Sequence, residues 1–161
     1  MSILTTAGRA AIAAAVKAQP LHLAWGPGDG AWVTPPPENP SATSLTNEIG
    51  RRLVTSCDFV TPDPVAGTIE VAGAGLFSIS ATPTNRLLIT TQFDYADAST
   101  SVVRQIGLFM GTQVVAGLPA GQRYFLPAEV QSPGSLVQLE NRAPIYRTSG
   151  TRERFEMLIV F

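Results

Sequence analysis

The sequence predicts a mainly β fold, an antiparallel β-sandwich or barrel of about six to eight strands with one N-terminal α-helix. Three observations predict it: an alanine-rich opening segment, apolar residues that alternate with polar ones from residue 51 onward, and prolines and glycines between the alternating runs. A period of two is typical of strands, whereas Pro and Gly break helices. We expect a single domain over residues 1–161, with a helix at 5–19, an extended loop at 26–41 and a β-sandwich at 51–161.

The opening segment carries the one helix that the pattern predicts. Thr5 or Thr6 can cap the free amides of the first turn, and the alanines that follow are strong helix formers. Pro20 ends the helix, because it disfavours the helical conformation in the residue before it. One face carries a narrow apolar stripe that consists of Gly8, Ile12 and Val16. We expect this stripe to dock onto a sheet or onto a neighbouring subunit.

A short strand follows the helix, because apolar residues alternate between residues 21 and 25. Residues 26–41 are so dense in Pro and Gly that they exclude a helix and disfavour ladder pairing, which predicts an extended loop. A stiff loop loses little entropy when it is ordered against a partner. The candidate interface residues in this part of the chain are Trp25, Trp32, Pro35, Pro36 and Pro37.

The rest of the chain is predicted to be strands. Leu53, Cys57 and Phe59 are expected on one side of a single strand. The clearest alternation runs from Leu87 to Tyr95 and is followed by a turn at 96–100. Further strands are expected at 69–71, 76–80, 102–110, 114–115, 136–141 and 155–161.

Composition points to a protein that works within an assembly. Charged residues make up 14% of the chain, against roughly 25% in a typical soluble domain, so we expect other subunits to cover part of its surface. The net charge of -1 provides no field for a nucleic acid. Arg147, Arg152 and Arg154 alternate with Glu153 and Glu156, which predicts a solvated or interfacial strand face. No segment has the roughly 20 apolar residues that would insert into a membrane.

The chain offers few residues for chemistry. The single histidine, His22, and the single cysteine, Cys57, are expected to be structural, with Cys57 a small buried side chain. The glycine-rich segments at 26–30 and 72–75 lack the Lys-Ser/Thr and the helix N-terminus of a phosphate site. We therefore expect no cofactor, no metal and no catalytic residues.

Asp94 and Asp97 are the best candidates for a carboxylate pair. They flank the end of a predicted strand, where a hydrolase can carry an acid and a base. The same carboxylates, with nearby carbonyls, can bind calcium. Aspartates in turns also cap backbone amides, which is the structural alternative.

Residues 102–109, Val-Val-Arg-Gln-Ile-Gly-Leu-Phe, resemble an element of tailed-phage proteins of the tail-collar-fibre and baseplate type. In those families the element is hydrophobic-Arg-Glu-Ile-Gly-Leu/Ile-Phe, so Gln105 replaces the usual Glu and weakens any ion pair or cap made there. Residues 4–11 and 124–129 also resemble such proteins. Together, the three segments are similar to small tail proteins of transposable siphophages of Pseudomonas-like hosts.

The resemblance implies a structural protein of the distal phage tail, assembled in the host cytoplasm. Such a protein joins the tail tip or baseplate to fibres or receptor-binding proteins. Its implied partners are other tail and baseplate proteins, fibres and further copies of itself. The motif residues have a structural role in the family, and here they are Arg104, Ile106, Gly107, Leu108 and Phe109.

Two other functions are compatible with the sequence. A carbohydrate-binding module for receptor recognition would stack sugars on aromatic rings. Its candidate residues are Trp25, Trp32, Tyr95 and Tyr124, which can equally pack against the ends of the sandwich. A tail-associated polysaccharide or peptidoglycan hydrolase would use Asp94 and Asp97.

Overall fold

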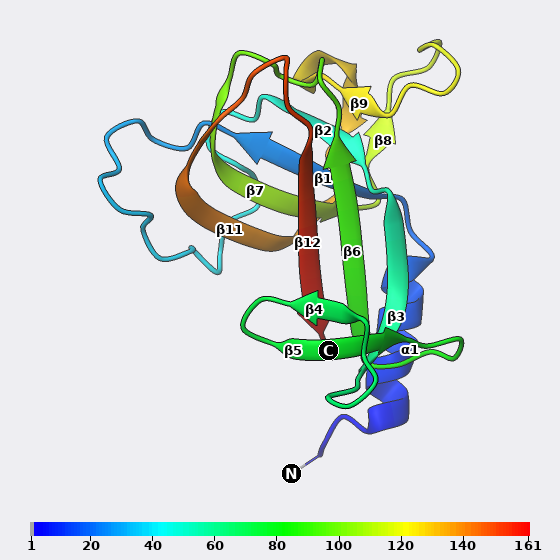
Figure 1. Ribbon diagram of the computed structural model, residues 1–161. Coiled ribbons are helices and arrows are strands. Elements are labelled where there is room, and N and C mark those ends of the chain that lie inside the picture. The colour runs from blue at the N-terminus through cyan, green and yellow to red at the C-terminus, as the bar shows by residue number, and fades with distance from the viewer. Residues whose placement is uncertain (1) are drawn as a thin grey trace. The chain divides into compact units, whose positions relative to one another are not determined.

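The structure, a computed structural model, describes residues 2–161 and is mainly β with one α-helix (Figure 1). This confirms the predicted class, although twelve strands form where six to eight were expected. The helix is α1 (Thr6–Lys17), and a short 3-10 helix, η1, covers Pro127–Glu129. The strands are β1 (Leu21–Gly26), β2 (Gly50–Leu53), β3 (Ser56–Pro62), β4 (Ile69–Val71), β5 (Gly75–Ile79), β6 (Arg86–Phe93), β7 (Val102–Met110), β8 (Gln113–Val114), β9 (Tyr124–Phe125), β10 (Val130–Ser132), β11 (Ser135–Tyr146) and β12 (Glu153–Val160).

The chain forms two compact units, each built from separate stretches of sequence. The first, here called the helix unit, contains residues 2–19, 54–91 and 154–161. The second, the loop unit, contains residues 20–53 and 92–153. Strands β6 and β12 each begin in one unit and end in the other. That residues 1–161 act as one domain stays a prediction.

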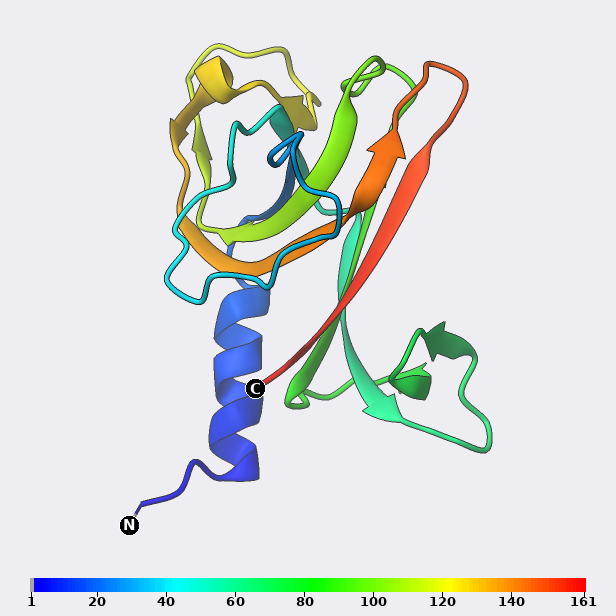
Figure 2. The ribbon, with the colours of Figure 1, turned by 90° about the vertical axis from the view of Figure 1, so that its left-hand side faces the viewer.

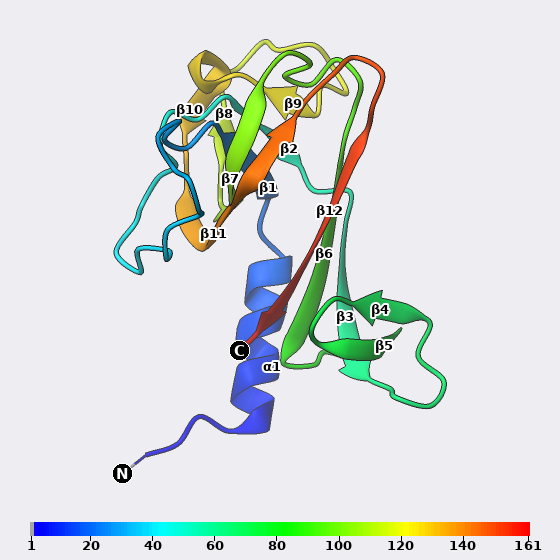
Figure 3. The same ribbon diagram turned by 60° about the vertical axis from the view of Figure 1, so that its left-hand side comes forward.

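Helix α1 begins and ends much as its sequence predicts. The Thr5 hydroxyl accepts a hydrogen bond from the Gly8 amide at 3.1 Å, which caps the first turn. At the other end, the Lys17 ammonium donates to the Cys57 carbonyl, lies 3.9 Å from the Asp58 carboxylate and sits 5.0 Å from the centre of the Phe59 ring. The last helical residue therefore fastens α1 to β3, which lies along the helix in Figure 1; in the turned view of Figure 3, α1 stands to the left of β6 and β3.

The sheet of the helix unit has the order β12-β6-β3-β5-β4. Its pairs are antiparallel, with Phe59 opposite Leu87 and Val60 opposite Ile79. Because side chains alternate across a strand, Phe59 faces α1 while Val60 faces away from it. On that second face Val60, Phe77 and Leu88 form a buried cluster against which Ile69, Val71 and Leu158 pack.

One predicted strand is divided in the structure. The single strand expected to hold Leu53, Cys57 and Phe59 is instead β2 and β3, which lie in different units. The Leu53 amide donates to the Arg123 carbonyl at 2.8 Å, whereas the Thr55 amide donates to the Thr90 carbonyl at 2.7 Å. The backbone therefore changes sheets within two residues, and no proline or glycine stands between Leu53 and Ser56 to mark the change.

The sheet of the loop unit has the order β11-β7-β1-β2-β9, and β8 pairs with β10 in a separate two-stranded ladder. All six residues of β1 are buried, because the strand lies in the middle of the sheet with both faces covered. β7 and β11 curve strongly (Figure 2). One face carries a cluster of Ala24, Leu45 and Phe109, with Leu136 and Leu139 packed on it.

Gly107 of the family motif lies under this cluster. A Cβ atom added there would come within 2.9 Å of both Leu45 Cδ2 and Leu136 Cδ1. That distance is shorter than a carbon–carbon contact allows. A side chain at position 107 would therefore require Leu45 and Leu136 to shift.

Arg51 is a buried cation at the centre of the loop unit, with 2% of its surface exposed. Its Nε and Nη2 donate to the two carboxylate oxygens of Glu48 at 2.8 and 2.7 Å. Its Nη1 donates to the Thr112 hydroxyl at 2.8 Å and to the Pro133 carbonyl at 2.7 Å. The guanidinium also lies 4.1 Å from the centre of the Phe109 ring. These contacts compensate for the loss of water around the charge.

Among residues 2–161, no helix has the length and apolar character that crossing a membrane requires.

Replacement of Arg51 should destabilise the loop unit strongly. Arg51→Met should lower the free energy of unfolding by about 3–5 kcal/mol, because it leaves the half-buried Glu48 carboxylate, and the Thr112 and Pro133 oxygens, without their partner. Arg9→Met removes an exposed arginine of α1 and should change stability by less than about 0.5 kcal/mol. Denaturant unfolding followed by circular dichroism measures both. Glu48→Gln combined with Arg51→Met should recover part of the loss, and equal stability of the two single arginine variants would contradict the assignment.

His22 should make stability fall in mild acid. Burial and the nearby charges of Arg51 and Arg123 lower the pKa of His22 from 6.5 to about 4, so the folded state keeps the ring neutral. Between pH 6.5 and about 4 the unfolded chain binds a proton that the folded chain does not, which lowers stability as pH falls. The loss reaches about 3 kcal/mol near pH 4, at about 1.4 kcal/mol per pKa unit.

The matched variant is His22→Gln, which removes this titration and keeps every carboxylate. The stability of the variant should fall less steeply than that of the natural protein between pH 6.5 and 4. Parallel curves from the two proteins would show that the folded state protonates His22 as readily as the unfolded state does.

Candidate functional site

The loop between β1 and β2 is the most distinctive surface feature of the loop unit. Residues 27–49 contain no helix and no strand, in agreement with the extended loop predicted at 26–41. Its first turn is built on Gly28, whose φ is +59° and whose added Cβ would lie 2.7 Å from the Trp32 ring. The Trp32 ring therefore packs onto the loop's own backbone, where a larger residue than glycine would collide with it.

Two side-chain amides, one buried and one half-buried, hold this loop. The Thr46 amide donates to Gln105 Oε1 at 2.7 Å, and Gln105 Nε2 donates to Asn141 Oδ1 at 2.8 Å. Asn141 Nδ2 then donates to the Pro36 carbonyl at 3.0 Å, and the Asn141 backbone amide donates to Glu38 Oε1 at 3.0 Å. We call Gln105 and Asn141 the amide relay. It connects β7 and β11 to two separate points of the loop.

The relay requires an amide at position 105. Gln105 is 5% exposed and uses both ends of its side chain, one to accept and one to donate. A glutamate would accept from Thr46, but when ionised it has no hydrogen to donate to Asn141. This gives a physical reason for Gln105 where the phage families usually have Glu.

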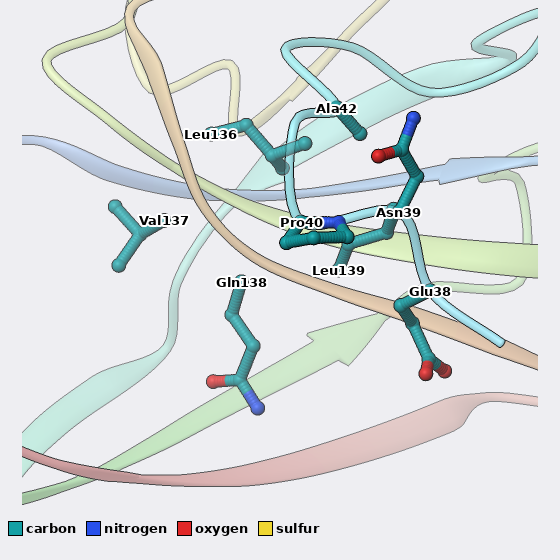
Figure 4. A pocket seen from close by; sticks show the side chains of 8 residues that line it. All are labelled: Glu38, Asn39, Pro40, Ala42, Leu136, Val137, Gln138 and Leu139. Carbon is teal, nitrogen blue, oxygen red and sulfur yellow. The ribbon is translucent and has the colours of Figure 1, made fainter.

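The loop stands beside a hollowed surface. A hollow of about 310 Å³ lies between loop residues and one stretch of β11, as Figure 4 shows. A second hollow of about 330 Å³ lies beside it. We call the two together the loop groove. Its lining includes Trp32, Pro36, Pro37 and Pro40 from the loop and Leu136 and Leu139 from β11.

Glu38 supplies the negative charge of the groove. The Asn141 amide that binds its carboxylate lowers the pKa of Glu38 below its ordinary value. The side chain is therefore ionised at neutral pH. It holds the loop to β11 and also gives the first hollow an acidic rim.

The predicted interface residues of the loop lie on or near this surface. Trp32 and Pro36 are half-buried, whereas Pro35 and Pro37 are exposed. Val33, which the sequence did not single out, is 98% exposed. The loop thus presents apolar side chains to solvent from a base that the relay holds.

The helix stripe is only partly exposed. Ile12 is 42% exposed and Gly8 is half-buried, but Val16 is 9% exposed and packs inside the helix unit together with Ala13. The face that α1 buries is thus rotated from the predicted stripe. Ile12 lies one turn before Val16, at the margin of the buried face, and remains partly exposed.

Trp25 is not on a surface, so its prediction as an interface residue is wrong. Its exposed fraction is 0%, and its ring stacks on Phe93 with centroids 3.5 Å apart. The indole donates to the Tyr124 hydroxyl at 3.3 Å, and the Arg147 guanidinium lies 5.2 Å from the ring centre. Its position on the central strand β1 explains this burial.

The four aromatic residues proposed for sugar binding are dispersed. Trp25 and Tyr124 belong to the interior cluster with Phe93, and Trp32 covers Gly28. Tyr95 is 46% exposed, with Arg152 at 4.6 Å from its ring centre. They do not form one platform.

Asp94 and Asp97 organise a turn. Asp97 is 6% exposed, and its Oδ2 accepts from Arg52 at 2.5 Å and from the Asp94 amide at 2.7 Å. The Asp94 carboxylate accepts from the Tyr95 amide at 2.8 Å and from Arg152 at 2.9 Å. These bonds, that from the Tyr95 amide first, lower the pKa of Asp94. Within the described part of the chain, no three His, Cys, Asp or Glu side chains gather as a metal site would need.

Arg147 corrects a second prediction. It was expected on a solvated or interfacial strand face with Arg152 and Arg154, but it is 4% exposed. Its guanidinium donates to the Asp94 carbonyl at 2.8 Å and to the Thr151 carbonyl at 3.0 Å. It therefore fastens the turn after β6 to the connection between β11 and β12, and only Arg152 and Arg154 are exposed.

His22 and Cys57 lie in different units and have separate environments. His22 is 4% exposed, with the Phe125 ring 5.6 Å away edge-on. Cys57 is a half-buried free thiol, and burial raises its pKa. Both environments favour the uncharged side chain.

Comparison with known proteins identifies a family. The family model described as "baseplate wedge 3 tail fiber network component" matches residues 1–161, the whole chain. No curated protein matches the chain. A component of this kind is a structural part of the phage tail, as the resemblance of residues 102–109 implied. The chain therefore belongs to the family of baseplate wedge 3 components of the phage tail-fibre network.

Proposed function

We propose that this baseplate component attaches or organises tail fibres or receptor-binding proteins through the surface formed by residues 26–41 and the loop groove. The observation that carries the proposal is the amide relay. Loops this long without secondary structure are uncommon, and they are either disordered or functional. Here the buried Gln105 and the half-buried Asn141 bind the loop at Thr46 and Pro36, which favours function.

The chemistry of the loop supports attachment. Pro35, Pro36 and Pro37 restrict the backbone, so ordering it against a partner costs little entropy. Val33 projects almost fully into solvent, where an apolar side chain gains nothing until a partner covers it. The groove beside them adds a concave surface with both apolar and polar lining.

The composition of the chain supports the same role. With 14% charged residues, the chain has less charge than a protein that must stay fully solvated on all sides. A surface that is covered in the virion does not need that charge. The family's place in the baseplate agrees with an action through contacts and not through catalysis.

A charge placed on the loop should weaken attachment. In phage that lack the natural protein and are complemented with Val33→Asp, we expect at least about tenfold fewer attached fibres or receptor-binding proteins, because the carboxylate would be buried against an apolar partner. Negative-stain microscopy and quantitative mass spectrometry of virions measure the number. Val65→Asp is the matched control, since Val65 is 93% exposed in the helix unit. Equal loss in both variants, or no loss in either, would contradict the role of the loop.

Gln105→Glu should release the loop without unfolding the protein. The substitution sets a carboxylate against Asn141 Oδ1 and should cost about 1–3 kcal/mol. Hydrogen exchange of the loop should accelerate at Thr46 and Asn141, and fibre attachment should fall with it. Gln113→Glu, at an exposed site on β8, should change neither. If hydrogen exchange accelerates while fibre attachment stays unchanged, attachment does not depend on an ordered loop, and the proposal is contradicted.

A further inference from the structure

One edge strand of the sheet in the helix unit is long. Its sheet has the order β12-β6-β3-β5-β4, so β12 and β4 are its two edges. β4 has three residues, whereas β12 has eight. We propose that β12 pairs antiparallel with β12 of a second copy of this chain, about a twofold axis at Phe155. This inference is independent of the role proposed for the loop.

A comparison of the two long edges in the chain supports the proposal. β11, an edge of the loop unit, carries Pro144 and two register shifts, and Glu38 binds its Asn141 amide. These are the features by which proteins prevent edge strands from pairing. β12, with the sequence ERFEMLIV, contains no proline, no glycine and no lysine. It lacks the protection that β11 has.

The outward-facing backbone groups of β12 can be assigned. The Phe161 amide donates to the Asn85 carbonyl at 3.0 Å, on the side of β6. Because successive residues of a strand point their backbone groups to opposite sides, residues 154, 156, 158 and 160 point away from β6. These are the groups that a strand from another chain would meet.

Charge on the same residues selects one register. Arg154 and Glu156 share a face of β12, their side chains are 63% and 32% exposed, and they lie 2.6 Å apart. A twofold axis at Phe155 sets Arg154 of each copy opposite Glu156 of the other. Opposite charges directly across an antiparallel pair stabilise it, and like charges destabilise it.

The neighbouring registers are unfavourable. An axis at residue 156 brings Glu156 opposite itself, and an axis at residue 154 brings Arg154 opposite itself. An axis at residue 157 sets Glu156 opposite Leu158 and Arg154 opposite Val160. Among the registers with an axis at residues 154 to 157, only the one at Phe155 sets opposite charges across the pair, which points to a second copy of this chain and not to an unrelated strand.

Charge reversal tests the pairing. The natural protein should sediment as a dimer, and Arg154→Glu and Glu156→Arg should each raise the dimer dissociation constant at least about tenfold, because each sets like charges opposite one another twice. An equimolar mixture of the two single variants should dimerise again. In that mixture each strand still carries two like charges, so recovery can only come from contacts across the two copies.

Sedimentation velocity over a concentration series, with circular dichroism as the check on folding, gives the readout. A natural protein that stays monomeric at all concentrations would overturn the proposal. So would single variants that dimerise unchanged, or a mixture that stays monomeric while both variants are folded. Pairing of β12 only when another tail protein is added would assign the edge to that protein instead.

Discussion

The loop unit depends on one buried guanidinium. Arg51 enters from β2, but its hydrogen bonds reach Glu48, Thr112 and Pro133, which lie on three different connections of the chain. Taking this charge out of water is costly, and the bidentate carboxylate, the two further acceptors and the Phe109 ring together offset the cost. The start of β2, the end of β7 and the start of β11 are thereby held at one point. Glu48 lies in the loop just before β2, so its bonds to Arg51 also fix that end of the loop.

In this unit, hydrogen bonds from polar side chains hold segments that have no backbone pairing in a sheet. The amide relay fixes the middle of the loop, and Arg147 fixes the turn after β6. Gln105 and Arg147 are buried and Asn141 is half-buried, and each binds backbone carbonyls or amides as well as side chains. The result is a surface of irregular backbone that needs no strand partner to keep its shape. The shape of such a surface is not restricted to the regular geometry of a strand, so it can be complementary to another protein.

Sequence patterns predicted those elements of the fold that residues adjacent in sequence specify by themselves. The alternation at 102–110 and the alanines of α1 led to elements with nearly the observed ends, because each side chain there reports its own face. The break between β2 and β3 left no such signal, since no proline or glycine stands where the backbone changes sheets. Trp25 was misplaced because an alternating strand looks alike in the middle of a sheet and at its edge.

The candidate surface was predicted in outline and missed in detail. Density of Pro and Gly located the loop, and Trp32 and the three prolines lie on or near the groove. Gln105 was noted only as a departure from a motif. Its purpose depends on Asn141 and Thr46, residues remote in sequence whose approach no local pattern encodes. Buried arginines such as Arg147 were missed for the same reason, because their partners come from other segments.

The interleaving of the two units bears on how this protein can change over generations. Neither unit is encoded by one continuous stretch of its gene, since the chain passes between them at residues 19–20, 53–54, 91–92 and 153–154. A recombination event that exchanges half of the gene would therefore change residues of both units at once, because each unit draws on both halves of the chain. The loop at 27–49, which contains most of residues 26–41, is the opposite case, a single uninterrupted stretch between β1 and β2, which are neighbouring strands of one sheet. If the loop is where fibres attach, a phage can alter that attachment by replacing one short segment and leave the scaffold untouched.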